Sequence, residues 1–120
     1  MGTVKVTARI GKSREETREI ELMVDTGSFY TMLSPSMCAE MGLNLALRQR
    51  VITADSRTVE IPLGLAYIQI ADREAGIPVG SLDVPMPLLG VSALEALGLK
   101  VDPVDGTLEP TRLFPDIPAL

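Results

Sequence analysis

Hydrophobic and polar side chains alternate along the first part of the chain. In residues 3–10 (TVKVTARI) every second residue from Val4 onward is apolar, which is the period of a strand with one buried face. Residues 19–24 repeat this alternation, and residues 11–13 between the two runs include the glycine and serine that are typical of turns. These features predict an antiparallel hairpin.

A short strand and a short helix are predicted next. Residues 29–33 are mostly apolar and fit a strand of a few residues. Ser34 and Pro35 match the N-cap and the first position of a helix, and Gly42 is placed to end that helix. We therefore expect one helix between Pro35 and Gly42.

A second hairpin is predicted between residues 51 and 70. Its two runs, VITA and RTVEIPLGLAYIQI, are rich in strand-forming residues, and Asp55 and Ser56 between them suit a tight turn. Pro62 and Gly64 interrupt the second run. We therefore expect a bend or an edge position near them.

The C-terminal third is predicted to be irregular around one helix. Residues 76–87 have the glycine and proline content of a loop. Residues 92–95 (SALE) have the spacing of a capping box, which predicts a helix over about residues 93–97 that stops at Gly98. A last strand is expected over residues 99–104.

The chain ends in a proline-rich tail. Residues 109–120 contain three prolines, so we expect an extended segment rather than a helix. Leu113, Phe114 and Ile117 are apolar, and such a tail cannot form a core of its own. We therefore expect these side chains to be buried on the body of the protein or on a partner chain.

Composition supports one globular domain. A chain of 120 residues with no internal repeat or linker has the size of a single domain, which we place over residues 1–120 with its core at about residues 3–108. Hydrophobic residues make up 46% of the chain. Because there is no Trp and there are only two Phe and two Tyr, the core should be aliphatic.

Charge and cysteine content narrow the surroundings in which we expect the protein to work. The formal net charge is −5 and the basic residues are scattered, which argues against nucleic acid and anionic membranes as partners. No apolar run approaches the roughly 18 residues that span a bilayer, and one cysteine cannot form an internal disulfide. We therefore expect a cytoplasmic protein.

The residue types that are missing limit the chemistry. The sequence contains no histidine, which excludes Ser-His-Asp and Cys-His catalysis. A zinc site of thiolates and histidines is excluded too, because Cys38 is the only cysteine, and we expect neither a metal nor a cofactor. Cys38 lies among apolar residues and is best explained as a packed small side chain.

One carboxylate stands in an unusual place. Asp25, Thr26, Gly27 and Ser28 form a polar group between the apolar runs LMV and FY. Taken alone, these four residues are typical of a turn. A carboxylate between apolar segments, however, costs free energy unless it is paired with another group or has a function. A second apolar element, residues 88–90 (LLG), follows downstream, and the second predicted hairpin lies between the two.

In this order, the features resemble the retropepsin-like aspartic proteases, the single-lobe family of retroviral proteases and their cellular relatives. ELMVDTGSFYTMLSP is similar to the catalytic strand and loop of that family, and TADSRTVEI looks like its flap hairpin. PLLGVSALEALGLKVDPVDGTL resembles its last apolar-apolar-glycine element, helix and closing strand. The resemblance extends from the first strand through Leu108.

The resemblance implies an all-β closed barrel with one or two short helices that works as a C2 homodimer. Because the chain has one Asp-Thr-Gly motif, each subunit would supply one Asp25 carboxylate across a two-fold axis. Such a pair shares one proton, so that the ionised carboxylate activates a water and the protonated one hydrogen-bonds the scissile carbonyl. The expected activity is that of an aspartic endopeptidase on a peptide or an unfolded protein.

The residues beside Asp25 take their expected roles from the same resemblance. In the family, the threonine that matches Thr26 interlocks with the partner loop, and the glycine that matches Gly27 lets the backbone approach the substrate. The alternatives are an ordinary turn hydroxyl for Thr26 and a turn position with positive φ for Gly27. Ser28 can donate a hydrogen bond to the Asp25 carboxylate or can simply be solvated.

The predicted flap departs from the retroviral pattern. Its tip, Ala54, Asp55 and Ser56, contains no glycine, whereas retroviral flaps are rich in glycine. The resemblance assigns these residues to substrate binding. The mobility of a glycine-rich flap does not carry over to this chain.

The second apolar-glycine element, Leu88, Leu89 and Gly90, departs from the pattern as well. Val91 follows Gly90, whereas retroviral proteases have an arginine there that contributes to the dimer interface. The dimer of this chain should therefore be held differently, and the tail from Leu113 onward is the candidate.

Two other interpretations are compatible with these residues. One is a non-catalytic peptide-binding or dimerisation module on the same fold, and the other is a structural domain in which Asp25 is a turn residue. An intact Asp-Thr-Gly argues against the first interpretation. Two Asp25 carboxylates within hydrogen-bond reach of each other would argue against the second.

Overall fold

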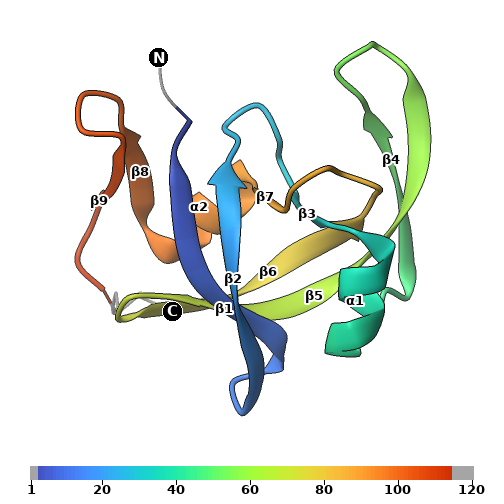
Figure 1. Ribbon diagram of the computed structural model, residues 1–120, viewed down its shortest axis with the longest axis horizontal. Coiled ribbons are helices and arrows are strands. Elements are labelled where there is room, and N and C mark those ends of the chain that lie inside the picture. Colours follow the sequence, from blue (N-terminus) through green and yellow to red (C-terminus); the bar gives the residue numbers. More distant parts are fainter. Residues whose placement is uncertain (1–2, 115–120) are drawn as a thin grey trace, which may run out of the picture.

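The computed structural model describes residues 3–114, and their fold is mostly β with two short helices (Figure 1). The elements follow one another as β1 (Lys5–Ser13), β2 (Glu16–Val24), β3 (Thr31–Leu33), α1 (Pro35–Met41), β4 (Leu47–Ile52), β5 (Thr58–Ile70), β6 (Arg73–Ser81), β7 (Leu88–Leu89), α2 (Val91–Leu97), β8 (Leu99–Asp102) and β9 (Thr107–Pro110).

Seven of these strands form one sheet in the order β1-β2-β7-β3-β6-β5-β4. β1 also pairs with β5, where Arg9–Gly11 lie opposite Tyr67–Gln69. The pairings therefore lead from β1 through five other strands and back to β1, and β4 lies outside this circuit, paired with β5. β8 and β9 form a separate two-stranded sheet.

The two-residue strand β7 determines how the site is built. It lies between β2 and β3, parallel to β2 through Met23–Leu88 and Val24–Leu89 and antiparallel to β3 through Met32–Leu88. β2 and β3 follow each other in the sequence, yet they do not pair with each other. β7 therefore brings Gly90 against the loop that joins β2 to β3.

The core is aliphatic, as the composition predicted. Its fully buried large side chains come from every strand of the seven-stranded sheet except β4, and from α2: Ile10, Leu22, Leu33, Ile61, Ile68, Ile77, Val79, Leu89 and Leu97. Burying a side chain of this kind contributes roughly 1.5–3 kcal/mol. α2 packs against β6, so that Leu94 and Leu97 lie in the same cluster as Ile77.

Both helices end where the glycines predicted, but only α1 begins as expected. The Ser34 hydroxyl accepts a hydrogen bond from the Met37 amide at 3.2 Å, and Gly42 ends α1 with φ 67°. α2 begins two residues early, at Val91, and Gly90 is its N-cap. The predicted capping box is wrong because the Ser92 hydroxyl donates to the carbonyl of Phe29 instead.

The first hairpin forms with a different turn. β1 continues through Gly11 to Ser13, and the chain turns at residues 14–15. Gly11 allows the backbones of β1 and β2 to approach closely, because a Cβ at this position would lie 1.8 Å from the carbonyl oxygen of Glu16. The pairing shifts register between Gly11 and Ser13, so the predicted turn residues form an irregularity within the strand.

The largest error concerns residues 76–87. Their glycines and proline predicted a loop, but the part up to Ser81 belongs to β6, and Ile77 and Val79 are fully buried. Gly80 is required by packing, since a Cβ there would meet side-chain atoms of Ile61 and Met32 at 2.6 and 2.9 Å. Glycine here marks tight packing within a strand rather than a strand end.

The second hairpin is longer than predicted. β4 begins at Leu47, and β5 runs as one strand of 13 residues through Pro62 and Gly64. Pro62 lies opposite Arg48 of β4 and beyond the last pair with β6, Leu63–Gly80, so β5 is paired there on one side. The edge position expected for this proline is therefore present.

The C-terminal segment begins with a strand that the sequence did not predict, and its described residues contain no helix, as expected for this tail. Residues 107–110 form β9, and β8 ends at Asp102 instead of residue 104. The buried Arg73 guanidinium donates to the carbonyls of Leu97, Gly98 and Arg112 and lies 5.4 Å from the centre of the Phe114 ring.

The expected burial of the tail is only partly present within one chain. Leu113 is 88% exposed, so it is not buried on the body of its own chain. Phe114 is partly buried beside Arg73, and Ile117 lies outside the described residues. No helix in the described part of the chain is long and apolar enough to cross a membrane.

Candidate active site

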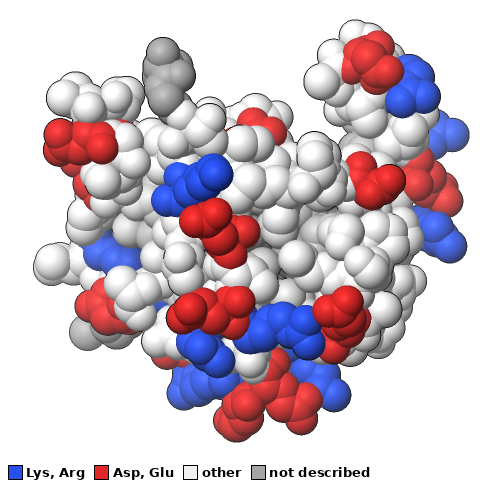
Figure 2. Space-filling model, viewed as in Figure 1, with Lys and Arg blue, Asp and Glu red and all other residues white. Residues whose placement is uncertain are grey.

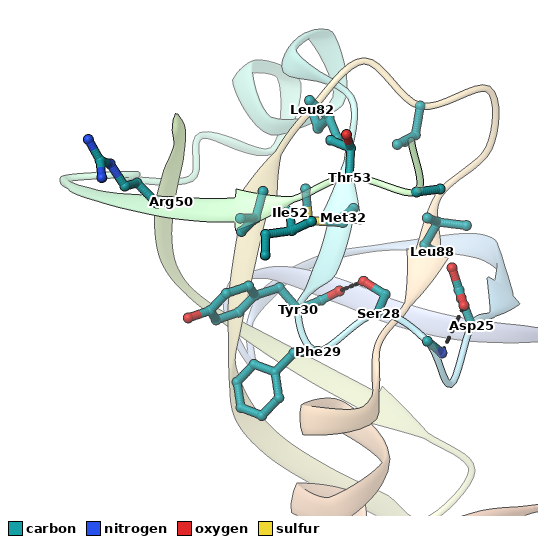
Figure 3. A pocket seen from close by; sticks show the side chains of 14 residues that line it. Asp25, Ser28, Phe29, Tyr30, Met32, Arg50, Ile52, Thr53, Leu82 and Leu88 are labelled. Carbon is teal, nitrogen blue, oxygen red and sulfur yellow. Dashed lines mark hydrogen bonds between the residues drawn. The ribbon is translucent and has the colours of Figure 1, made fainter. Parts of the chain in front are cut away.

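Asp25 stands at the end of β2, where the chain leaves the sheet (Figure 3). Its amide donates to the carbonyl of Leu89 at 3.0 Å, so that the pairing of β2 with β7 holds it in place. The side chain is only partly buried. An apolar strand thus delivers a carboxylate to the surface of the molecule at a fixed position.

The loop folds back on the Asp25 carboxylate. The Gly27 amide donates to Asp25 Oδ1 at 3.0 Å, and the Ser28 amide donates to the Asp25 carbonyl at 3.1 Å. Gly27 does not have a positive φ, so the interpretation of it as such a turn position is wrong. A Cβ on Gly27 would lie 3.3 Å from Asp25 Oδ1, and glycine therefore keeps the space beside the carboxylate open.

Residues 90–92 clamp the far side of the loop. The amides of Val91 and Ser92 donate to the carbonyls of Ser28 and Phe29 at 2.8 and 3.0 Å. The Gly90 amide donates to the hydroxyl of the fully buried Thr31 at 3.1 Å. The structure therefore brings residues 90–92 into contact with the loop that follows Asp25.

Gly90 is needed for this contact. A Cβ there would lie 2.4 Å from both the carbonyl carbon and the carbonyl oxygen of Tyr30, and 2.7 Å from the carbonyl oxygen of Phe29. These are backbone atoms, which cannot move aside as a flexible side chain can. Any side chain at position 90 would therefore push the loop of residues 25–30 out of place.

A groove of about 790 Å³ opens over Asp25. Its lining comes from the loop of residues 25–30, from β3 and β7, from the β4–β5 hairpin and from the segment after β6: Asp25, Gly27, Ser28, Phe29, Tyr30, Met32, Arg50, Val51, Ile52, Thr53, Ala54, Leu82, Val84 and Leu88. Most of these side chains are apolar. Of the described residues that line the groove, Asp25 alone carries a carboxylate.

The comparison with known protein families agrees with this geometry. Residues 14–96 match the family described as "gag-polyprotein putative aspartyl protease". The chain belongs to this retropepsin-like aspartyl protease family. The match spans β2, the β4–β5 hairpin, β7 and nearly all of α2, and so includes Asp25 and Gly90. No curated protein matches the chain significantly.

Ser28 does not have the partner that the sequence suggested for it. Its hydroxyl donates to the carbonyl of Tyr30 at 2.7 Å and not to the Asp25 carboxylate (Figure 3). The hydroxyl therefore holds the loop together behind the carboxylate. Thr26 is exposed at the outer side of the loop, and its interlocking with a partner loop stays a prediction.

The predicted flap residues lie at the tip of the β4–β5 hairpin, but only one of them lines the groove. Ala54 does so, together with Thr53 before it, whereas Asp55 and Ser56 do not. The hydroxyl of Thr53 hydrogen-bonds the Asp55 carboxylate and is the main reason why the pKa of Asp55 is lowered.

Sequence reasoning missed several lining residues, among them Tyr30, Met32, Leu82 and Val84. The last two lie in the segment after β6, far from Asp25 in the sequence. Their apolar character alone did not distinguish them from core residues. Only the packing of β3 between β6 and β7 brings them to the groove.

The surface around the groove is largely uncharged. Figure 2 shows charged side chains gathered over the turn of the β1–β2 hairpin, at the bottom of the view, and along the outer side of the β4–β5 hairpin. Few lie in the hollow between the β4–β5 hairpin on one side and the β8–β9 hairpin on the other. Among the residues that the structure describes, no group of three acidic, Cys or His side chains could hold a metal. Cys38 is buried, which raises the pKa of its thiol, so it is poorly suited to act as a nucleophile.

Proposed function

We propose that this protein is an aspartic endopeptidase that works as a homodimer, with the Asp25 carboxylates of two chains forming the catalytic pair. The observation that carries the proposal is a single carboxylate, fixed by backbone hydrogen bonds, in a groove otherwise lined by apolar and neutral side chains and Arg50. Membership in the aspartyl protease family supports the same conclusion.

The chemistry needs two carboxylates because two protonation states are required at once. Two carboxylates held close together share one proton. The ionised one removes a proton from a water molecule while the protonated one hydrogen-bonds the carbonyl oxygen of the scissile bond. One chain lines the groove with one carboxylate, so a second copy is the simplest source of the other.

Several features of the chain support an approach of two copies loop to loop. In Figure 1 the loop between β2 and β3 lies between two raised hairpins, β4–β5 on one side and β8–β9 on the other. The β8–β9 sheet pairs with no other described strand, so its edges are available to a partner. The circuit of pairings that joins β1 to β5 supports a closed barrel.

The substrate we infer is an extended peptide with apolar side chains beside the scissile bond. The groove walls present Phe29, Met32, Ile52 and Leu82, and Ile52 and Phe29 are 77% and 57% exposed. β4 pairs only with β5 in the sheet order, and an extended chain beside a free strand gains main-chain hydrogen bonds. Unfolded proteins offer such segments more readily than folded ones.

The decisive experiment uses the full chain with denatured casein across acidic to neutral pH. We expect cleavage with a bell-shaped rate profile on the acid side of neutrality, because only the singly protonated pair is active. The control is Asp25→Asn, whose Oδ1 can still accept from the Gly27 amide, so the fold and the dimer should persist while cleavage is lost. Full activity in this variant, or a rate that keeps rising into alkaline pH, would place the chemistry on another group.

Dilution tests the dimer separately. Specific activity should fall as the protein is diluted, in step with dissociation followed by sedimentation. Deleting residues 113–120 tests whether the exposed Leu113 and the tail strengthen the dimer. A fully active monomer would refute the paired-carboxylate mechanism while leaving family membership intact.

The second candidate function is a peptide-binding module without turnover. The open apolar groove favours it, since the same lining would hold an extended peptide whether or not it is cut. Casein that binds to the parent protein and to Asp25→Asn alike, with no cleavage by either, would favour this candidate.

A further inference from the structure

The tip of the β4–β5 hairpin is ordered although it contains no glycine. The Thr53 amide donates to the Arg57 carbonyl at 2.8 Å, and the Ser56 amide donates to the Thr53 carbonyl at 2.9 Å. Ser56 has φ 66°. A three-residue hairpin loop needs this left-handed conformation at its last position, which glycine usually supplies. Another interaction must therefore hold the tip in shape.

The Asp55 carboxylate supplies that interaction with both of its oxygens. Oδ1 accepts a hydrogen bond from the Thr53 hydroxyl, and Oδ2 accepts one from Arg57 Nε at 2.7 Å. Thr53 ends the β4 side of the loop and Arg57 begins the β5 side. The carboxylate thus ties the two sides of the tip together across the turn.

The two faces of the tip have different surroundings. Thr53 and Ala54 line the groove over Asp25, whereas Asp55, Ser56 and Arg57 do not. Asp55 and Arg57 therefore lie on the side of the tip that a bound peptide would not contact, and the Thr53 side chain joins them to the groove. Asp55 can act on the substrate only through the backbone that it holds.

We propose that Asp55 is a positioning residue, whose carboxylate keeps the hairpin tip in the shape that presents Thr53 and Ala54 to the substrate. This inference rests on the proposed protease function and deepens it, because it separates the tip residues that meet the peptide from those that order the tip. Thr53 and Ala54 contact the peptide. Asp55 and Arg57 hold the backbone of these two residues in the turn conformation that a glycine would usually allow.

Because the side chains of the network are exposed to solvent, removing Asp55 should affect substrate binding rather than the stability of the whole protein. The Asp55 and Arg57 side chains are 58% and 72% exposed, and exposed ion pairs contribute little to global stability. Without Asp55 the tip would be less ordered before substrate binds, and binding would have to order it. The loss should therefore appear as a higher KM, by about 3- to 10-fold, with kcat nearly unchanged.

The kinetic test compares Asp55→Ala with Asp55→Asn and with a matched control, Asp72→Ala. Asp72 lies in the β5–β6 turn, where the neighbouring Ala71 also has a positive φ, 54°. The asparagine keeps an oxygen for the Thr53 hydroxyl but loses the charge that attracts Arg57, so its KM should be intermediate. The control should leave both constants unchanged. A fall in kcat at constant KM would overturn the positioning role, because it would place Asp55 at the reacting groups.

A double-mutant cycle identifies the partner. Arg57→Ala should raise KM less than Asp55→Ala, since the Thr53 hydrogen bond remains, and the two changes together should be less than additive. Strict additivity would mean that Asp55 and Arg57 act separately, which contradicts a shared network.

Amide hydrogen exchange on the full chain tests the ordering without any protease activity. The amides of Thr53 and Ser56 should exchange faster in Asp55→Ala than in the parent protein, while amides of β1 and β2 stay unchanged. Unchanged exchange at Thr53 and Ser56 would refute the inference even in an active enzyme. If the parent protein cleaves nothing while these amides still exchange faster in Asp55→Ala, the proposed function is refuted and the role of Asp55 in ordering the tip remains.

Discussion

The loop that holds Asp25 and the tip of the β4–β5 hairpin both line the groove, yet they are held in different ways. Residues 25–30 are fixed mainly by backbone groups of residues 89–92, some sixty positions away in the sequence, around the fully buried Thr31. The tip at residues 53–57 is held by its own exposed side chains. The comparison teaches that the position of the Asp25 carboxylate is tied to the buried core through residues 89–92, while the tip can change its order without unfolding the protein.

Gly90→Ala should have the largest effect on this contrast. The new Cβ would meet backbone atoms of Tyr30 at 2.4 Å, so the loop of residues 25–30 or β7 must shift. We expect a loss of about 3 kcal/mol in the free energy of unfolding together with loss of casein cleavage, both measurable by denaturant unfolding and by the cleavage assay.

The matched control for that change is Gly76→Ala, where a Cβ would meet nothing within 4 Å. It should change the free energy of unfolding by less than about 0.5 kcal/mol. Equal effects of the two substitutions would show that the contact of Gly90 with Tyr30 is not what holds the loop.

Thr31→Val should have the second largest effect. Valine keeps the branched shape but removes the hydroxyl that accepts from the Gly90 amide at 3.1 Å. A buried amide without a partner costs about 2 kcal/mol, which denaturant unfolding would detect. A stability equal to that of the parent would mean that the amide finds another acceptor, and the core would then be less involved in holding the loop.

Ser28→Ala should have a smaller effect, and on stability only. Its hydroxyl donates to the Tyr30 carbonyl, not to Asp25, so removing it costs about 1 kcal/mol of unfolding free energy. The acid limb of the cleavage profile should stay where it is in the parent protein. A shift of that limb to higher pH would indicate that Ser28 hydrogen-bonds the carboxylate in the active dimer.

The smallest expected effect is a pH dependence confined to the hairpin tip. The Thr53 hydroxyl first, and then Arg57, lower the pKa of Asp55 in the folded protein. A carboxylate with a lowered pKa adds order at pH values above its unfolded pKa of about 4 and loses it as pH falls through the folded value. NMR shifts of the Thr53 and Ser56 amides should therefore move in acid, and should not move in Asp55→Asn.

Local signals in the sequence were reliable where one residue has one dominant role. Ser34, Pro35 and Gly42 predicted the limits of α1, and the Ser34 hydroxyl and the φ of Gly42 confirm the reasons. Gly98 ended α2 in the same way. Caps depend on groups a few residues apart, so the sequence contains all that they need.

Local signals failed where a distant segment competes for the same group. Ser92 had the spacing of a capping residue, but the Phe29 carbonyl takes its hydroxyl. Gly80 resembled a loop residue, but it makes room for Ile61 and Met32 inside β6. Nothing near either residue in the sequence indicates these neighbours.

The sequence by itself determined the mostly-β character, the aliphatic core, and the position of Asp25 in a loop after a strand. Alternation, capping and the order of motifs are properties of neighbouring residues. Only the tertiary structure decided that Ser28 binds Tyr30, that Leu82 and Val84 line the groove, and that Asp55 lies behind the tip. These facts depend on which segments β7 and β6 bring together, because a hydrogen bond or a groove wall is formed by groups that become neighbours only when the chain folds.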